Sequence, residues 1–482
     1  MTPDTPCSVT DTMHALAYIG DLTMGQPTDH SLRTAWLASR IAEAAGCGDA
    51  DCAAIPQVAL LRWSGCTANA PEFSELLGND IEGRALMMSQ RLDDPAFALL
   101  GQRLGGDMQR LAEIHCEVSG DVARMLNVSD DVEHALRSIF ASNDGGGPNH
   151  GRKEGVPASV FIVALASDVE VLSRVQGLER ALSIIVHKSG HAYPAALAAV
   201  AVRHAQQWLE ILDRDESWYA DLAFEAVAGG VVPLELLADV IDLKLPWMTG
   251  YSRRVAEAAR CAALVMGLEA ETAQRCYRAG LLHGIGRASV PNTVWNTVGR
   301  LSAAAKEQLR LAPYWTSRAT ARLGTLSDDA YLGSYAAERL DGSGAFRACA
   351  GAAIPVEGRI VAAATAWVAL QSARPWRAAM TPEQARAVLE SEVASGRFDV
   401  GAARAVAGGA MPPVADHNDI MLTEREIEVF RGISLGQTNK EVARSLAISP
   451  STVRTHVENV FRKLGCTTRA AATLKASTLR LL

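Results

Sequence analysis

The sequence of 482 residues has no Cys-x-x-Cys pair, since its nine cysteines are well separated between Cys7 and Cys466. This spacing argues against a zinc module and a secreted disulfide scaffold, and it is typical of a reducing cytosol. The first residues lack the basic region and the apolar run of a signal peptide. No apolar stretch reaches the roughly 18 residues of a membrane helix without a charged or polar cluster. We therefore expect a soluble, cytoplasmic protein with no membrane partner.

Two common signalling modules are also missing. Neither GSGAFR (342–347) nor GQTNK (436–440) has the G-x-x-x-x-G-K-[ST] spacing of a phosphate-binding P-loop. No βα pattern with a phosphorylatable aspartate is evident, so no two-component receiver is expected. Hydrophobic residues make up 49% and charged residues 21%, which is a globular composition. The length suits about three domains.

The net charge of −8 hides an asymmetry along the chain. Residues 421–482 hold ten Lys and Arg against five Asp and Glu, whereas the other 420 residues hold 36 against 49. A small basic module on an acidic body suggests that one end binds a polyanion. The acidic body would repel DNA and confine the contact to that module.

Local signals in the basic module predict three short helices. Residues 408–420 contain glycine, two prolines and polar residues, and they read as a linker before a domain at 421–482. Thr423 with Glu426, and Thr438 with Glu441, have the spacing of a capping box. Ser449 precedes Pro450, which is an N-cap followed by proline at the first helical position, and Gly465 closes the last helix. The predicted helices cover about 424–433, 439–446 and 450–464.

The third predicted helix has two faces. Its apolar stripe consists of Val453, Val457, Val460, Phe461 and Leu464. The opposite face carries polar and charged side chains of the kind that a DNA major groove accepts: Arg454, Thr455, Glu458, Asn459 and Arg462. Spacing alone leaves open whether this face meets DNA or merely water.

The segment LTEREIEVFRGISLGQTNKEVARSLAISPSTVRTHVENVFRKLGCTTRAAA (422–472) closely resembles the LuxR-type helix-turn-helix of bacterial transcription regulators. The likeness runs ungapped over about fifty residues and includes LTERE, NKEVA, STVRTHV and KLG. It implies that the helix from Pro450 to Leu464 enters the major groove of double-stranded DNA. The resemblance places Arg454 and Thr455 against bases. The residues that it places at or near phosphates are Lys440, Ser451, Thr452, His456 and Lys463; Asn459 joins them on the DNA-facing side.

One position departs from that family's pattern. Glu458 stands where many relatives carry a base-contacting lysine, so it either reads cytosine N4 or repels guanine. The closing segment TRAAATLKASTLRLL resembles the fourth helix through which the family dimerises, and a homodimer is expected. Whether the body, the last helix or both drive dimerisation stays open.

The first 407 residues contain one pattern twice at an offset of 221. LLRWSG (60–65) aligns with LLHGIG (281–286), and DHSLR (29–33) aligns with GYSRR (250–254) without a gap between. The segments are alanine-rich with helical periodicity. We predict an all-α chain: two tandem bundles at 1–215 and 230–407, followed by a four-helix DNA-binding domain.

Both copies resemble the HD-GYP branch of the HD-domain phosphohydrolases, an all-helical metalloenzyme fold, and the second copy does so more closely. Its matching segments are LLHGIGRASVPNTVW, ERLDGSG, AIPVEGRIVAAATAWVAL and SARPWRAAMTPEQA. Active members hold two or three divalent metals with His and Asp, and the metals activate water against a phosphodiester. In the second copy, the resemblance places those ligands on Tyr251, His283-Gly284, Ala312, Ala336-Ala337 and Thr365, where only one ligand remains.

The first copy departs differently. The resemblance places its ligands on His30, Arg62-Trp63, His115, Ile139-Phe140 and Ser167. The two histidines are expected to be ordinary buried or hydrogen-bonded side chains. On this alignment, we expect neither a bound metal, nor another cofactor, nor catalytic residues, and the prediction is a protein that is not an enzyme.

The resemblance also concerns cations that hold phosphates of a cyclic dinucleotide. Arg287 replaces the lysine of the HDIGK motif, and Arg374 and Arg377 of RPWR lie at phosphate-binding positions. Alternatively, Arg374 and Arg377 cap a helix end or pair with Asp341 and Glu338. The first copy has Cys66, Gln176 and Glu179 at these positions, so any ligand pocket is expected in the second copy.

The resulting interpretation is a bacterial transcription regulator with an inactive tandem HD-like body, which serves as a sensor of a nucleotide-type ligand or as a dimerisation platform. Two alternatives remain. One is a metal-dependent cyclic-dinucleotide phosphodiesterase fused to a DNA-binding domain. The other is a pure dimerisation scaffold.

Overall fold

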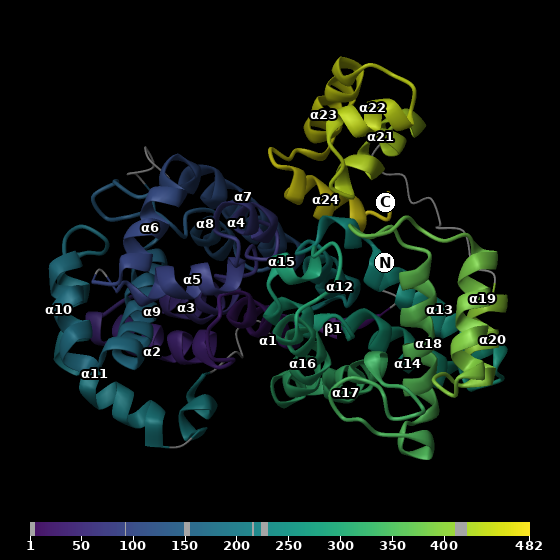
Figure 1. The fold of residues 1–482 in the computed structure, drawn as a ribbon. Coiled ribbons are helices and arrows are strands. Elements are labelled where there is room, and N and C mark those ends of the chain that lie inside the picture. Colours follow the sequence, from purple (N-terminus) through teal and green to yellow (C-terminus); the bar gives the residue numbers. More distant parts are fainter. Residues whose placement is uncertain (1–4, 92, 149–154, 215, 223–229, 410–421) are drawn as a thin grey trace. The chain divides into compact units, whose positions relative to one another are not determined.

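The computed structural model describes residues 5–91, 93–148, 155–214, 216–222, 230–409 and 422–482 (Figure 1). It is almost entirely helical, as predicted, with a single two-stranded sheet of β1 (Pro6–Ser8) and β2 (Val231–Pro233) among the described residues. In the described part of the chain, no helix combines the length and the apolar character needed to cross a bilayer. The chain divides into two compact units, Ser8–Val232 and Pro233–Leu482, with Met1–Cys7 counted in the second. The predicted domain boundaries stay predictions, and residues 410–420 of the predicted linker lie outside the described residues.

The first unit contains eleven α-helices among its described residues. Its central pairs are α2 with α3 and α2 with α9, which bury an apolar core between them. The helices are α1 (Val9–Thr23), α2 (His30–Ala45), α3 (Asp49–Leu61), α4 (Ala70–Leu77), α5 (Asp80–Ser89), α6 (Pro95–Leu104), α7 (Met108–Met125), α8 (Asp130–Arg137), α9 (Ala158–Gln176), α10 (Leu178–Lys188) and α11 (Ala195–Arg214).

The second unit repeats this organisation and then adds the C-terminal helices. The HD-like part has α12 (Glu235–Asp242), the short 3-10 helix η4 (Pro246–Met248), α13 (Tyr251–Val265), α14 (Ala270–Leu282), α15 (Asn292–Trp295), α16 (Ala303–Ala319), α17 (Ser327–Gly333), α18 (Val356–Leu370), α19 (Pro382–Ala394) and α20 (Val400–Gly408). The C-terminal part has α21 (Glu424–Ser434), α22 (Asn439–Ser445), α23 (Pro450–Leu464) and α24 (Arg469–Thr478), drawn in yellow in Figure 1.

A buried carboxylate motif supports the internal repeat. Asp21 accepts hydrogen bonds from the Ser31 hydroxyl at 2.6 Å and the Ser31 amide at 3.1 Å. Asp242 accepts the same pair from Ser252, at 2.7 and 2.8 Å. Each serine is the second residue of its helix, α2 or α13. The aspartate therefore accepts hydrogen bonds from two donors near the start of that helix. Both members of the repeat therefore fix this helix by the same local device.

Small residues let the helices of the second copy approach closely. The core there is rich in alanine, including Ala259, Ala262 and Ala279, all fully buried. A Cβ atom on Gly280 of α14 would lie 2.5 Å from the Cα atom of Ala256 on α13. The α13–α14 contact therefore depends on the missing side chain at position 280.

Candidate DNA-binding face and HD-domain pockets

The helix starts of the C-terminal part are fixed by side-chain caps. Thr423 and Glu426 form a complete capping box, as do Thr438 and Glu441. The Ser449 hydroxyl accepts the Thr452 amide at 3.0 Å. These caps confirm the start signals predicted from the sequence, and the three helices end within one residue of the predicted positions.

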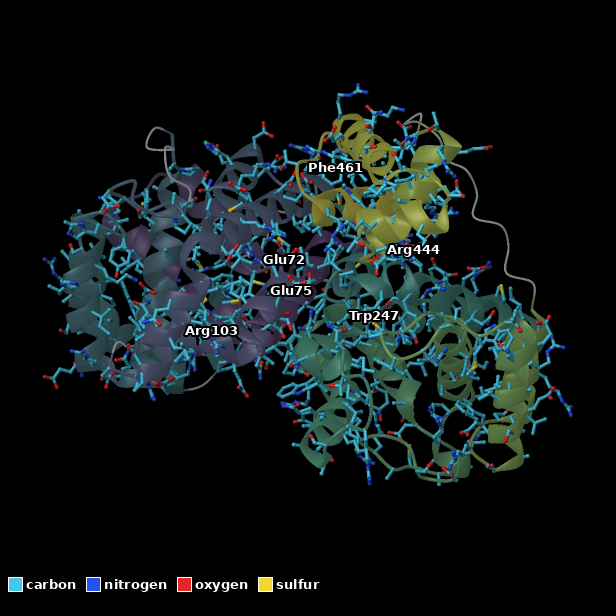
Figure 2. The ribbon with its side chains drawn as sticks, turned by 45° about the horizontal axis from the view of Figure 1, so that its top comes forward. Glu72, Glu75, Arg103, Trp247, Arg444 and Phe461 are labelled. Atoms are coloured by element: carbon cyan, nitrogen blue, oxygen red, sulfur yellow. The ribbon has the colours of Figure 1, made fainter. Side chains whose placement is uncertain are left out.

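The α23 helix rests on an apolar stripe and exposes its polar face. Val453, Val460 and Leu464 are buried, and Phe461, labelled in Figure 2, meets Phe430 of α21 edge-on with ring centroids 6.3 Å apart. The Arg454 side chain is 76% exposed and Glu458 is 62% exposed. A helix seated on one stripe with a polar outer face is able to enter a major groove without moving its core.

Charged side chains on this face already have partners in the free protein. The Arg454 guanidinium donates to the Glu458 carboxylate at 2.8 Å, and this bond raises the pKa of Arg454. Lys463 donates to Glu426 at 2.6 Å, so it ties α23 to the first capping box. Binding DNA bases through Arg454 therefore requires the Arg454–Glu458 pair to be broken or shared.

The other predicted DNA contacts are exposed or half-buried. Exposed side chains include Lys440, Ser451, Thr452 and Thr455, whereas His456 and Asn459 are half-buried. The hydroxyls of Ser451 and Thr452 both lie within hydrogen-bond distance of the Ser449 hydroxyl. The DNA contacts themselves stay predictions.

In the second copy, Arg287 is part of a buried ion pair. Its guanidinium donates to Asp242 Oδ1 at 2.9 Å and to Nε2 of His283, and it lies over the Tyr251 ring. His283 Nδ1 donates to the Gly280 carbonyl at 2.6 Å, so Nε2 is the unprotonated nitrogen that accepts from Arg287. Burial, reinforced by the Arg287 charge, lowers the pKa of His283. The guanidinium of Arg287 is thus engaged within the fold and does not face an external phosphate.

The same arrangement bears on metal binding. The nitrogen of His283 that a metal ion would use is occupied by Arg287, and Tyr251 donates its hydroxyl to the Thr365 carbonyl at 3.1 Å. Within the described ranges, no group of three or more His, Cys, Asp or Glu side chains is placed to hold a metal ion. The donors around His283 therefore do not fit a divalent metal as they stand.

The two arginines of RPWR have different surroundings. Arg377 donates to the carbonyls of Ala369, Leu370 and Ala378, so it caps the end of α18. Arg374 lies over the rings of Trp247 and Tyr251, at 4.6 and 4.8 Å. Its Nη1 is buried with no hydrogen-bond partner. Of the predicted phosphate ligands, Arg374 is the one with a free donor.

Aromatic side chains beside Arg374 were not singled out from the sequence. Trp247, labelled in Figure 2, meets Trp376 at a centroid distance of 5.9 Å, and Trp376 is 45% exposed. Trp247 belongs to η4, and two residues later Thr249 donates to the Ser434 carbonyl at the end of α21, at 3.0 Å. No spacing rule relates position 247 to position 376, so only the fold reveals this cluster.

A cavity also lies in the first copy, where the sequence predicted no ligand pocket, and which copy holds a ligand stays a prediction. Arg62, His115, Phe140 and Ser167, four of the positions aligned with metal ligands, line a single cavity of about 200 Å³. His30 is fully buried with its Nδ1 2.6 Å from Glu170, and His115 donates through Nε2 to the Arg62 carbonyl at 2.8 Å. The prediction that both histidines are buried and hydrogen-bonded is confirmed.

Two family models match the chain. Residues 235–401 match the HD domain, and residues 421–476 match the bacterial regulatory proteins of the luxR family. The C-terminal part is 45% identical over 62 residues to the probable transcriptional regulatory protein NarL of Mycobacterium tuberculosis, which covers 13% of this chain and 29% of that protein.

The body is similar to enzymes of Vibrio cholerae. The 3'3'-cGAMP-specific phosphodiesterase 3 is 24% identical over 426 residues, covering 80% of this chain and 91% of the enzyme. The 3'3'-cGAMP-specific phosphodiesterase 1 is 35% identical over 167 residues, covering 34% of this chain and 38% of the enzyme. The crystal structure of a cyclic GMP-AMP-specific phosphodiesterase from the same organism superposes with a TM-score of 0.59 at 22% identity, covering 84% of this chain and 97% of that one. This last likeness shows the shared fold.

These relatives contradict the prediction that the chain is not an enzyme. That prediction depended on aligning single ligand positions, whereas the similarity to phosphodiesterases extends over most of the body. Fold and family likeness together give the identification: this chain joins an HD-domain body, similar to cGAMP phosphodiesterases, to a C-terminal LuxR-type helix-turn-helix domain.

Proposed function

We propose that this protein is a transcription regulator that binds double-stranded DNA as a homodimer through α23 and responds to a nucleotide-type ligand in its HD-domain body. The observation that carries the proposal is the exposed polar face of α23, with Arg454 and Thr455 on a helix whose opposite stripe is buried. This face lies within the segment that matches the luxR family. Residues 421–482 carry a net positive charge, whereas the rest of the chain is acidic, and this difference supports a polyanionic partner for the C-terminal domain.

Arg454 is the residue that we assign to base reading. A guanidinium pairs with two acceptors on guanine, and Glu458 competes for it in the free protein. Arg454→Ala is expected to cost about 1–3 kcal/mol at one base position. Glu458→Gln releases the guanidinium, so it is expected to tighten binding and to change the preferred base.

DNA fragments selected from a random pool by the full chain would test both variants. Arg310→Ala is the matched control, because Arg310 is a half-exposed arginine of α16 paired to Glu307. Arg454→Ala binding the selected sequence as tightly as the control would refute the assignment.

For the ligand, Arg374 and its aromatic neighbours are the best-supported site. A guanidinium with a free donor suits a phosphate, and exposed Trp376 beside Trp247 suits a stacked purine. The compound 3'3'-cGAMP, for which the two Vibrio cholerae relatives are named, contains both phosphates and purines. The hydrogen bond from Thr249 to Ser434 gives a contact through which the η4 segment is able to influence α21.

Titration calorimetry of the full chain with 3'3'-cGAMP tests this site. We expect binding that Arg374→Ala weakens at least tenfold and Arg310→Ala leaves unchanged. Equal binding by the two variants would show that Arg374 does not hold the ligand.

A phosphodiesterase fused to a DNA-binding domain is the second candidate, and the similarity to two cGAMP-specific phosphodiesterases favours it. Incubation of the full chain with 3'3'-cGAMP and Mn²⁺, with and without a chelator, distinguishes the two. Chelator-sensitive release of linear dinucleotide would establish the enzyme. Binding without turnover would leave the ligand as an effector.

A further inference from the structure

The first HD-like copy contains a cavity of about 200 Å³ between α1, α4, α5, α7 and α9. Most of its lining is apolar and includes four methionines and two phenylalanines: Met24, Met87, Met88, Met108, Phe73 and Phe140. Methionine side chains adapt to the shape of a ligand. The cavity lies within the first unit, whereas the Arg374 cluster lies within the second.

Two guanidiniums are buried at this cavity, and among the described residues neither forms an ion pair with a carboxylate. Arg62 is 9% exposed, and Arg84 is 1% exposed. The described hydrogen bonds of Arg84 go to neutral oxygens, of Cys66, Asn69 and Thr23. Arg62 makes one long bond, 3.4 Å, to the Val163 carbonyl and lies over the Trp63 ring. Burying a cation without an ion-pair partner has a high desolvation free energy. An anion bound in the cavity would offset part of that free energy.

Unused donors lie beside the same cavity. Arg62 Nε and Trp63 Nε1 are both buried with no hydrogen-bond partner, and both residues line the cavity. Each is a donor with no acceptor capacity. An incoming group must therefore bring acceptors, as a carboxylate does.

The remaining polar groups offset the charge of Arg62 only in part: the charge of Asp168 raises the pKa of Arg62, but burial is the larger effect and lowers that pKa to about 10. Asp168, the one carboxylate in the lining, is bonded to Lys188 and Gln90. His115 is held neutral, because burial lowers its pKa to about 3. Asp21, the counterpart of the Asp242 that pairs with Arg287, is engaged with Ser31. The charge at the cavity is therefore positive.

We propose that this cavity binds a small organic acid with an aromatic or alkyl body, whose carboxylate pairs with Arg62. The size fits, since a cavity of about 150 Å³ holds benzene, and about 200 Å³ has room for a ring with a short acidic arm. The methionines and phenylalanines cover the body of the acid. Arg84 keeps its hydrogen bonds to the Thr23 and Cys66 carbonyls and to the Asn69 side chain, and it holds the wall of the cavity in place.

Titration calorimetry of the full chain tests the assignment with 3-phenylpropionate, phenylacetate and octanoate. The alcohols 3-phenylpropan-1-ol, 2-phenylethanol and octan-1-ol are the matched neutral probes. At least one acid is expected to bind with a Kd below about 1 mM and at least tenfold more tightly than its alcohol. No binding by any of the three acids, or equal binding by acid and alcohol, would overturn the proposal.

Three variants separate the charge from the shape. Arg62→Met is expected to weaken the acid at least tenfold and to raise the melting temperature of the free protein, since a buried unpaired charge is replaced by an apolar side chain. Ala112→Leu fills the cavity without touching the charge and is expected to abolish binding. Arg40→Met, at a paired and more exposed arginine of α2, is the control. Acid binding by Arg62→Met at the level of this control contradicts the role of Arg62.

Discussion

The buried histidine of the first copy makes the stability of the protein depend on pH. His115 is 1% exposed and donates to the Arg62 carbonyl, and burial lowers its pKa from 6.5 to about 3. The nearby charges of Arg84 and Arg62 act in the same direction. Between pH 6.5 and pH 3 the unfolded chain binds a proton on this imidazole and the folded chain does not. The free energy of unfolding therefore falls as the pH falls through this window.

The size of the effect follows from the two pKa values. Going from pH 7 to pH 5, the unfolded imidazole becomes almost fully protonated while the folded one stays neutral, which costs about 2 kcal/mol. His115→Gln keeps a donor for the Arg62 carbonyl but does not titrate. Between pH 7 and pH 5, the free energy of unfolding of the variant should therefore fall by about 2 kcal/mol less than that of the wild type.

Urea unfolding of the full chain at pH 7 and at pH 5 measures this difference. Unfolding is monitored by a signal from the first copy, such as the fluorescence of a label attached there. His134→Gln, which changes an exposed histidine of α8, is the matched control. If His115→Gln and His134→Gln lose the same stability between the two pH values, the argument from burial fails.

Two further predictions concern the second copy and the DNA-binding face. Arg287→Met leaves Asp242 buried without its partner and should destabilise the protein by about 3–5 kcal/mol. The double variant Arg287→Met, Asp242→Asn should cost less stability than the sum of the two single changes. Urea unfolding measures these costs, and additive costs would contradict the pairing. Lys440→Ala removes one exposed cation and should reduce the slope of log affinity against log salt by about 1 at every DNA sequence; filter binding at several salt concentrations checks this, and an unchanged slope would remove Lys440 from the phosphate contacts.

The C-terminal helices were predictable from the sequence because their start signals are local. A capping box joins residues three apart, so Thr423 with Glu426 and Thr438 with Glu441 carry the whole interaction within one turn. The internal repeat was predictable for a related reason. The offset of 221 relates the first residues of α2 and α13, His30 and Tyr251, without an intervening gap.

The partners of buried cations were not predictable, because they come from distant parts of the chain. Arg287 was expected to face a phosphate, but it is neutralised by Asp242, which is 45 residues away. Arg377 fulfils the alternative of a helix cap, on α18, and not the pairing with Asp341 or Glu338. The residues that line the cavity of the first copy are spread along the sequence from Met24 to Val171, so no short sequence motif predicts this cavity.

Each copy buries a guanidinium near the position of His283, one turn apart in the two copies, and the surroundings of the two guanidiniums differ. In the second copy, Arg287 lies one turn after His283, and Asp242 supplies the counter-charge from within the fold. In the first copy, Arg62 stands at the position equivalent to His283, and burial raises the pKa of Asp21, the equivalent of Asp242, to about 7. Burial raises the pKa of Asp242 as well, and each carboxylate accepts hydrogen bonds from a serine. The two copies differ because Asp242 pairs with Arg287, whereas the described ion pairs of the first copy do not join Asp21 to Arg62. The second copy is therefore closed around its own ion pair, while the first leaves a cation beside an open cavity, and it is there that an external anion gains most.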